Sequence, residues 1–394
     1  MKKYYLIFLL MSSGWGLCAQ SSSVDTAAWR GETQVDFLFH YYDQDGIHSA
    51  VTGGVGTEEL SAYDSQVQVY IPMDSVSQLH IRGGVNYYSS ASTDRIDTKI
   101  SSASSSDVQT QLYIDWEEAP SDQRVRYGLG VGGATESDYL SGSISGFLAW
   151  RSRDRSREYQ IQPQLFFDRW QLFFPDELRG SVSVDTDQRN AYNLGLTLHQ
   201  IIGPRLQLSL SSDLSLQQGL LSTPFHRVYF PGEELPRLER FPNWRFRLPL
   251  GGRLHYYWGD FLIGRLFYRY YWDTFDLQSH TIQLGLAIKI GASLTLSPTY
   301  RFHHQLASRY FAPFRDQSPD AQYYTSDYDL ATFDSQQWTL GIQYSPLYGI
   351  GRWRYGKHQR LQVLKSWTFR IGTYRRSDGL TAFMLSTGLG FSLY

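Results

Sequence analysis

The chain has 394 residues, of which 16% are aromatic and 19% are charged. Its formal net charge is −2, so the composition gives no reason to expect a nucleic-acid partner. A high aromatic content combined with a low mean hydropathy is typical of a membrane β-barrel, in which only alternate strand residues are apolar.

The first residues have the pattern of a secretory signal peptide. Two lysines precede a short apolar run, and cleavage is expected after Ala19. The run is too short to form a membrane-anchoring helix. A lipoprotein signal at Cys18 is the weaker alternative, because the bulky Leu17 stands where a small residue is expected. We therefore expect residues 1–19 to be removed and residues 20–394 to form one domain without cysteine.

Alternating apolar and polar residues recur along the rest of the chain and predict β-strands. In the stretch 261–272, Leu266 and Tyr268 share one face while Arg265 and Arg269 share the other. No later segment is a continuous apolar run of about 18 residues, so entry into a membrane requires a closed barrel. In chain order, the expected strands lie near residues 33–42, 67–71, 79–87, 108–117, 125–131, 139–150, 159–167, 192–198, 206–210, 244–258, 261–272, 281–290, 294–303, 338–344, 367–371 and 383–393.

The lengths of the connections between these strands alternate with strand number. Long loops follow odd-numbered strands, whereas tight turns follow even-numbered strands at 73–75, 119–122, 203–204, 259–260 and 291–292. An up-and-down barrel places the two kinds at opposite ends, and outer-membrane barrels have short periplasmic turns and long outer loops. We therefore predict an all-β, transmembrane, up-and-down antiparallel β-barrel of about sixteen strands in the outer membrane of a Gram-negative cell.

Two details of the strand pattern are expected to disturb the barrel locally. Pro298 lies inside a predicted strand and should break one ladder hydrogen bond. In the last strand the apolar series falls on odd positions, as at Phe391 and Leu393, so the terminal Tyr394 is out of phase. The register of that strand is therefore open.

Five loop stretches resemble those of a widespread family of Gram-negative outer-membrane barrel proteins that has no assigned function. They are 50–60 (AVTGGVGTEEL), 89–97 (SSASTDRID), 220–230 (LLSTPFHRVYF), 309–314 (RYFAPF) and 323–330 (YYTSDYDL). The resemblance implies a barrel in the outer membrane and supplies no reaction and no ligand. A strand that ends in an aromatic residue also resembles the signal read by the outer-membrane assembly machinery. That machinery and outer-membrane lipid are thus the expected partners.

Charged residues on the inferred inward faces are the most suggestive functional feature. Facing basic and acidic walls would set a transverse field across an open lumen and bias the passage of solutes. Alternatively, the charges pair across the interior and close it. The two alternatives are nearly balanced, and we favour a narrowed, loop-filled lumen. The predicted lumen-lining residues are Arg245, Arg247, Arg253, Arg265, Arg269 and Arg301 on late strands and Asp36, Asp115 and Glu117 on early strands.

The candidate metal ligands do not follow a recognised spacing. They are His226, His303, His304, Asp327 and Asp329, and no pair of them has zinc-site spacing. Hydrogen-bonded loop residues are the simpler interpretation, so we expect neither a metal nor a cofactor.

No enzyme motif is convincing either. A hydrolase built on Ser222 and His226 would lack the G-x-S-x-G elbow, since the stretch 142–146 (GSISG) misplaces its serine. The leading hypothesis is a non-enzymatic channel or transport-related envelope protein of unknown solute. The competing hypothesis is a non-conducting accessory barrel whose loops bind an envelope or extracellular partner. A hydrolase is a distant third.

Overall fold

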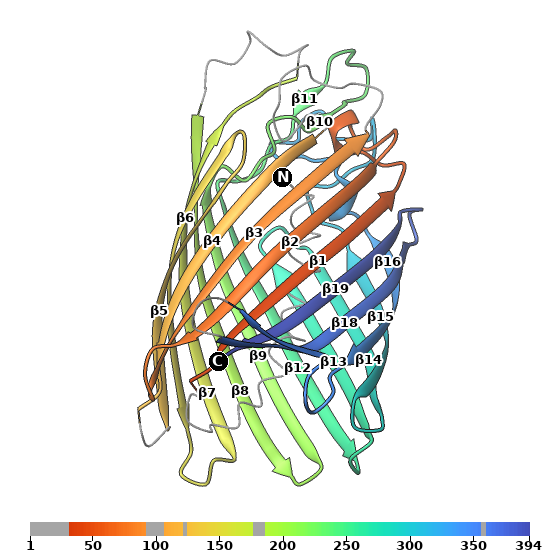
Figure 1. Cartoon of the computed structure of the whole chain (residues 1–394). Coiled ribbons are helices and arrows are strands. Elements are labelled where there is room, and N and C mark those ends of the chain that lie inside the picture. The colour runs from red at the N-terminus through yellow and green to blue at the C-terminus, as the bar shows by residue number, and fades with distance from the viewer. Residues whose placement is uncertain (1–30, 92–105, 121–123, 176–185, 356–359) are drawn as a thin grey trace.

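The fold is a closed β-barrel (Figure 1). The computed structural model describes residues 31–91, 106–120, 124–175, 186–355 and 360–394, and the expected signal peptide lies outside them. Sixteen antiparallel strands close the barrel, which confirms the predicted all-β, up-and-down architecture. They are β1 (Thr33–Asp45), β2 (Glu59–Pro72), β3 (Ser77–Ala91), β4 (Ser106–Glu118), β5 (Val125–Thr135), β6 (Tyr139–Arg151), β7 (Arg157–Gln171), β8 (Thr186–Gly203), β9 (Leu206–Gly219), β12 (Trp244–Trp258), β13 (Leu262–Asp273), β14 (Gln278–Ile290), β15 (Leu294–Leu306), β16 (Phe333–Tyr344), β18 (Arg360–Arg376) and β19 (Thr381–Leu393).

Each barrel strand pairs with its neighbours in sequence order, and β1 also pairs with β19 to complete the ring. Thr33 lies opposite Leu393 at one end of that last pairing, and Asp45 lies opposite Thr381 at the other. Among the described residues the helices are two short 3-10 turns, η1 (Ala50–Thr52) and η3 (Tyr328–Leu330). No helix of the described chain is long and apolar enough to cross a membrane.

Three further strands lie in connections that the alternation did not resolve. β10 (Arg227–Val228) and β11 (Arg237–Leu238) pair with each other between β9 and β12. β17 (Gly351–Tyr355) pairs with the start of β18, at the end of the barrel that carries the tight turns. The prediction that every long connection follows an odd-numbered strand is therefore wrong for β16 to β18. The reason is that β18 extends beyond its pairing with β16, which ends at Trp367, and β17 pairs with this extension.

Apolar side chains cover the outside of the barrel. On β4 the outward residues Leu112, Ile114 and Trp116 are 52%, 38% and 36% exposed. Water would make such a continuous apolar surface unfavourable, whereas lipid would not. A closed ring leaves no strand edge unpaired in hydrocarbon. The strands therefore form a barrel of the outer-membrane type.

Aromatic side chains form belts near both ends of the outer surface. Toward the long-loop end, the ring of Tyr63 lies 5.1 Å from that of Tyr41 and 6.2 Å from that of Tyr87. Toward the turn end, the Trp116 and Tyr127 rings lie 6.0 Å apart. Such girdles mark the two membrane interfaces of a transmembrane barrel, so the apolar band between them spans the bilayer.

The predicted effect of proline on the ladder is confirmed. The β14–β15 register runs to the pair Gly285 and Thr299 and resumes at Ile288 and Leu296, which leaves a gap beside Pro298. The β15–β16 ladder continues through Pro298 on the opposite side, where no proline N–H is needed. One ladder is interrupted and the barrel remains closed.

The last strand pairs with β1 in one continuous register, whereas its pairing with β18 has a bulge between Leu364 and Ser366. Phe383 and Leu389 face outward, while Ala382 and Met384 are buried on the inward side. Tyr394 follows the strand and is half exposed, which explains why it is out of phase. Its hydroxyl accepts a 2.7 Å hydrogen bond from the Lys365 ammonium.

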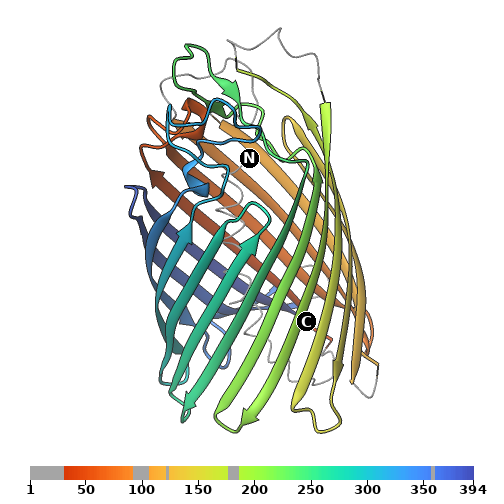
Figure 2. The ribbon, with the colours of Figure 1, turned by 180° about the vertical axis from the view of Figure 1, so that it is seen from behind.

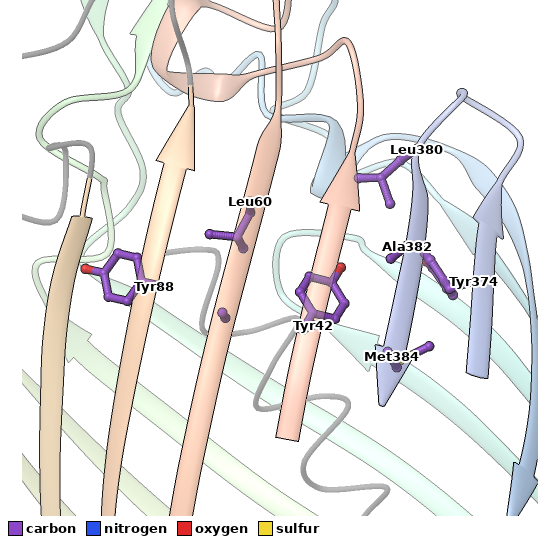
Figure 3. Close-up of a cluster of buried hydrophobic side chains, with 8 residues drawn as sticks. Tyr42, Leu60, Tyr88, Tyr374, Leu380, Ala382 and Met384 are labelled. Atoms are coloured by element: carbon purple, nitrogen blue, oxygen red, sulfur yellow. The ribbon is translucent and has the colours of Figure 1, made fainter. Parts of the chain in front are cut away.

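An apolar cluster lines the inside of the barrel close to the long-loop end (Figure 3). Its members lie on β1, β2, β3, β18 and β19 and, for Leu380, in the turn between the last two strands, and all are less than 10% exposed. These five strands therefore carry a packed apolar patch on the inner wall near the loops. The residues are Tyr42, Leu60, Ala62, Tyr88, Tyr374, Leu380, Ala382 and Met384.

Candidate functional site

Three long connections gather at one end of the barrel, where Figure 1 shows β10 and β11 and Figure 2 shows the same end from behind. They are 46–58 between β1 and β2, 220–243 between β9 and β12, and 307–332 between β15 and β16. We call these three segments together the cap. They contain nearly all residues of four of the five loop stretches on which the family resemblance rests, whereas most of the stretch 89–97 lies outside the described residues.

Hydrogen bonds and apolar contacts join the cap segments to one another. The amide of Arg240 donates to the carbonyl of Tyr324 at 3.1 Å, and the amide of Tyr324 donates back at 2.8 Å. The guanidinium of Arg227 donates to the carbonyl of Val51 at 2.8 Å. Val228 is completely buried against Tyr324. The cap thus has its own core and is held in one arrangement across all three segments.

One arginine of the barrel wall anchors the cap. The Arg376 side chain on β18 is 1% exposed, and its guanidinium lies 2.7 Å from a carboxylate oxygen of Asp329 and 2.5 Å from one of Asp378. It also donates to the carbonyl of Tyr328 at 2.8 Å and stacks over the Phe333 ring at 4.0 Å. Asp329 and Tyr328 belong to segment 307–332, so the buried guanidinium is a strong, directional tie between this segment and the wall.

The glycines of segment 46–58 allow it to approach its neighbours closely. Gly54 has φ +88°, and a Cβ there would lie 2.6 Å from the carbonyl oxygen of Ser326. We expect Gly54→Ala to destabilise the cap by about 1–3 kcal/mol, since a positive φ and a backbone clash act together. Faster proteolysis of loop 307–332 in detergent micelles would measure this loss.

A matched variant separates the clash from the backbone strain. Gly232 has φ +76° in the same cap, and no atom lies within 4 Å of a Cβ built there. Gly232→Ala should therefore show only the strain and should change proteolysis less than Gly54→Ala does. Equal effects of the two variants would rule out the close contact as the reason for the glycine.

The predicted acidic lumen residues lie on the inward face, and two of them pair with arginines of their own wall. Asp115 is 2.9 Å from the guanidinium of Arg82 on the neighbouring strand β3. Glu117 is 3.1 Å from that of Arg126 on β5. These carboxylates therefore pair along the wall and do not cross the lumen to the basic residues on late strands. Asp36 lies inward on β1, where its carboxylate approaches Gly390.

The predicted basic residues lie on the inward faces of β12, β13 and β15, alternating with exposed apolar residues. Arg245 pairs with the buried carboxylate of Asp273. The guanidinium of Arg253 lies 5.4 Å from the Phe267 ring, and that of Arg301 donates to the Gln283 side chain at 2.8 Å. Arg247 also lies inward on β12.

Positive charge predominates on this side of the interior. Within the described chain, Arg265, Arg269 and Arg301 form no ion pair. They lie on strands in the half of the ring away from the paired charges of β3 to β5. The interior therefore has a charge-compensated wall and a basic wall, rather than the facing acidic and basic walls of the simplest sequence interpretation.

The structure brings together only two of the five candidate metal ligands, His226 and Asp327. His303 accepts or donates a 2.8 Å hydrogen bond with Thr281 on the inward face, His304 pairs with Asp334 at the rim, and Asp329 binds Arg376. Ser222 accepts a hydrogen bond from the amide of Phe241 at 2.8 Å, which is a structural role. The stretch 142–146 lies inside β6 and forms no elbow.

Sequence reasoning missed Glu239 in the cap and Arg376, the wall residue that anchors it. Glu239 is 4% exposed and joins His226 and Asp327 in a compact cluster of three side chains. A second cluster, formed by Asp107, Glu136 and Asp138, contains carboxylates only. The sole sequence signal for the first cluster was the placement of His226 and Asp327 in two stretches that carry the family resemblance.

Comparison with known proteins identifies a family. The family model described as "Protein of unknown function (DUF3570)" matches residues 9–356, which confirms the resemblance. No curated protein sequence matches the chain.

Three solved bacterial structures resemble the chain at low sequence identity. The siderophore receptor PirA from Pseudomonas aeruginosa has 9% identity and a TM-score of 0.41, over 86% of this chain and 56% of that chain. A mutant of the ferric enterobactin receptor PfeA from Pseudomonas aeruginosa has 10% identity and a TM-score of 0.45, over 86% and 53%. OccK1 (OpdK) from the same organism has 8% identity and a TM-score of 0.37, over 91% and 98%. The chain thus spans about half the length of the two receptors that it matches.

Proposed function

Because the chain belongs to the DUF3570 family of proteins of unknown function and forms an outer-membrane barrel, we propose that it is a gated channel for small anionic solutes. The observation that carries the proposal is the basic inner wall, where Arg265, Arg269 and Arg301 form no ion pair within the described chain. Fixed positive charge in a narrow, low-dielectric passage favours anions over cations. The protein would reach the outer membrane after export and after cleavage of the signal peptide that the sequence predicts.

The cap supplies the gate. It lies over one end of the barrel and is tied to the wall by Arg376. The apolar cluster around Tyr42 and Tyr374 lies on the inner wall near the cap and offers a passing ion few polar groups on that side. The resting channel is therefore closed, and release of the cap opens it.

Planar bilayer recordings test the proposal. Wild-type protein should conduct rarely. The Arg376→Met variant, in which the cap is expected to be released from the wall, should give frequent conductance steps. Its reversal potential in a KCl gradient should indicate anion selectivity. Arg265→Glu, made in that released background, should shift the reversal potential toward cation selectivity. Silence of the released variant would exclude conduction.

The control for charge alone is Arg153→Glu. Arg153 is exposed in the tight turn between β6 and β7, away from the inner wall. This variant changes the net charge by the same amount as Arg265→Glu and should leave the reversal potential where it was. An equal shift in both variants would show that the inner wall does not set selectivity.

A non-conducting accessory barrel is the second candidate. Apolar residues on the cap face outward, with Ile47 and Leu235 both 62% exposed. Exposed apolar side chains on a folded cap are suited to an envelope or extracellular partner. Silent bilayers for both the wild type and the variant with a released cap would favour this role.

A further inference from the structure

We propose that the cap binds one divalent transition-metal ion of the zinc class between His226, Glu239 and Asp327. Their ligand atoms all lie within 4.8 Å of one another. The site is separate from the basic inner wall, so the proposal does not depend on conduction.

The fold of the cap brings the three residues together. The amide of Glu239 donates to the carbonyl of His226 at 3.0 Å, which makes them neighbours across the hairpin of β10 and β11. The paired hydrogen bonds between Arg240 and Tyr324 then lay segment 307–332 beside this hairpin. Asp327 follows three residues after Tyr324 and so reaches the same point. The ligands come from two segments that are distant in sequence.

Both carboxylates are oriented by backbone amides. One oxygen of Glu239 accepts from the amide of Thr223 at 2.9 Å, and one oxygen of Asp327 accepts from the amide of Asp329 at 2.8 Å. The other oxygen of each lies near His226 Nδ1, at 3.5 Å for Glu239 Oε1 and 3.7 Å for Asp327 Oδ2. Outer contacts of this kind hold ligating groups in place in metal sites.

Within the described chain, the buried imidazole of His226 lacks a hydrogen-bond partner on one nitrogen. His226 is 5% exposed, and its Nδ1 has no hydrogen-bond partner. A buried ring nitrogen without a partner is costly, and so are two carboxylates in the same small space. A cation between the three groups satisfies the nitrogen and neutralises the carboxylates at once.

The spacing and the ligand types select the ion. Two ligands of a tetrahedral Zn²⁺ at about 2.1 Å lie about 3.4 Å apart, close to the separations at His226 Nδ1. Imidazole suits zinc and its first-row neighbours, whereas Ca²⁺ and Mg²⁺ prefer oxygen ligands alone. Three protein ligands leave one tetrahedral position for water. The bound ion would fasten segment 220–243 to segment 307–332 and hold the cap closed.

Metal titration of the full-length, detergent-solubilised protein tests the site. The protein carries a tag without histidine, is stripped with a chelator and is titrated with ZnCl₂ or CoCl₂. Wild type should bind one equivalent, and Co²⁺ should give visible absorption bands of a tetrahedral site. His226→Gln should abolish both signals.

His304→Gln is the matched control. His304 Nδ1 lies 2.7 Å from an Asp334 carboxylate oxygen at the exposed rim, so it offers a histidine and a carboxylate without the third ligand. This variant should keep the full equivalent of metal. Loss of the signal in His304→Gln to the same degree as in His226→Gln would overturn the assignment.

A positioning variant tests the site without removing a ligand. The hydroxyl of Thr325 donates to Glu239 Oε1 at 2.5 Å and accepts from the amide of Asp327. Thr325→Val should weaken metal affinity roughly 10–100-fold. Heat-dependent migration on gels verifies that each barrel is folded. Stripped wild type that is folded and binds no more Zn²⁺ or Co²⁺ than His226→Gln overturns the proposal.

Discussion

Replacing Arg376 with methionine is expected to release the cap from the barrel wall. The substitution removes both ion pairs, the hydrogen bond to the carbonyl of Tyr328 and the contact with the Phe333 ring. Breaking a buried ion pair costs about 3–5 kcal/mol, because the remaining charges keep their desolvation penalty. Since about 1.4 kcal/mol corresponds to a tenfold change in an equilibrium, opening of the cap should increase at least about 100-fold.

Hydrogen exchange in segment 307–332 measures this release, and bilayer conductance reports whether the barrel opens with it. Arg375→Met is the control, because Arg375 is the neighbouring residue on the same strand and is exposed. Exchange in the Arg375 variant should match that of wild type. Unchanged exchange in Arg376→Met would mean that other cap contacts suffice and that Arg376 is not the anchor.

Replacing Leu112 with arginine is expected to destabilise the folded barrel in lipid by about 2–4 kcal/mol, the usual cost of a charge at the bilayer midplane. Leu112 faces outward in the middle of β4, four residues from Trp116 in the aromatic belt. Gly83 on β3 lies opposite Leu112, and no atom lies within 4 Å of a Cβ built on it, so there is open space beside position 112. The cost of the arginine therefore comes from contact with lipid rather than from a steric clash.

Urea titration of the barrel refolded into vesicles measures the effect as a lower midpoint. Gln111→Arg is the matched control, since Gln111 is adjacent in sequence and faces the interior. There the arginine remains in a polar environment and should change the midpoint much less. Equal midpoints for the two variants would mean that the outer face of β4 does not contact hydrocarbon.

The barrel was predictable because its signals are local and repeated. Alternation along each strand is imposed by the backbone itself, and lipid on one side makes the pattern recur in every strand. Even the break beside Pro298 followed from the missing N–H of one residue. The strand β18 shows the limit, because the apolar series ends near Ile371 while pairing continues to Arg376.

The cap was not predictable in the same way. Glu239 reaches His226 through a hairpin of two strands of two residues each, which is too short to show a period. Arg376 contacts Asp329 across 47 residues, and no local rule links such positions. The resemblance in the loop stretches pointed to the right segments, but only the folded chain shows that they meet.

The charged residues of the inner wall were predictable in part. Their faces followed from alternation, yet Asp115 and Glu117 pair with Arg82 and Arg126 on adjacent strands. Pairing depends on which strands are neighbours and on their register, and the sequence pattern specifies neither in detail. An excess of positive charge on one wall is therefore a property of the closed ring.

The pairing of β1 with β19 gives the ring a single seam between the two strands that are farthest apart along the chain. Until that seam forms, β1 and β19 each present unpaired amides and carbonyls, which cost several kcal/mol apiece in hydrocarbon. Insertion and sealing must therefore wait for the complete set of strands. A chain truncated before β19 would leave β1 and β18 as open edges and could not close in hydrocarbon.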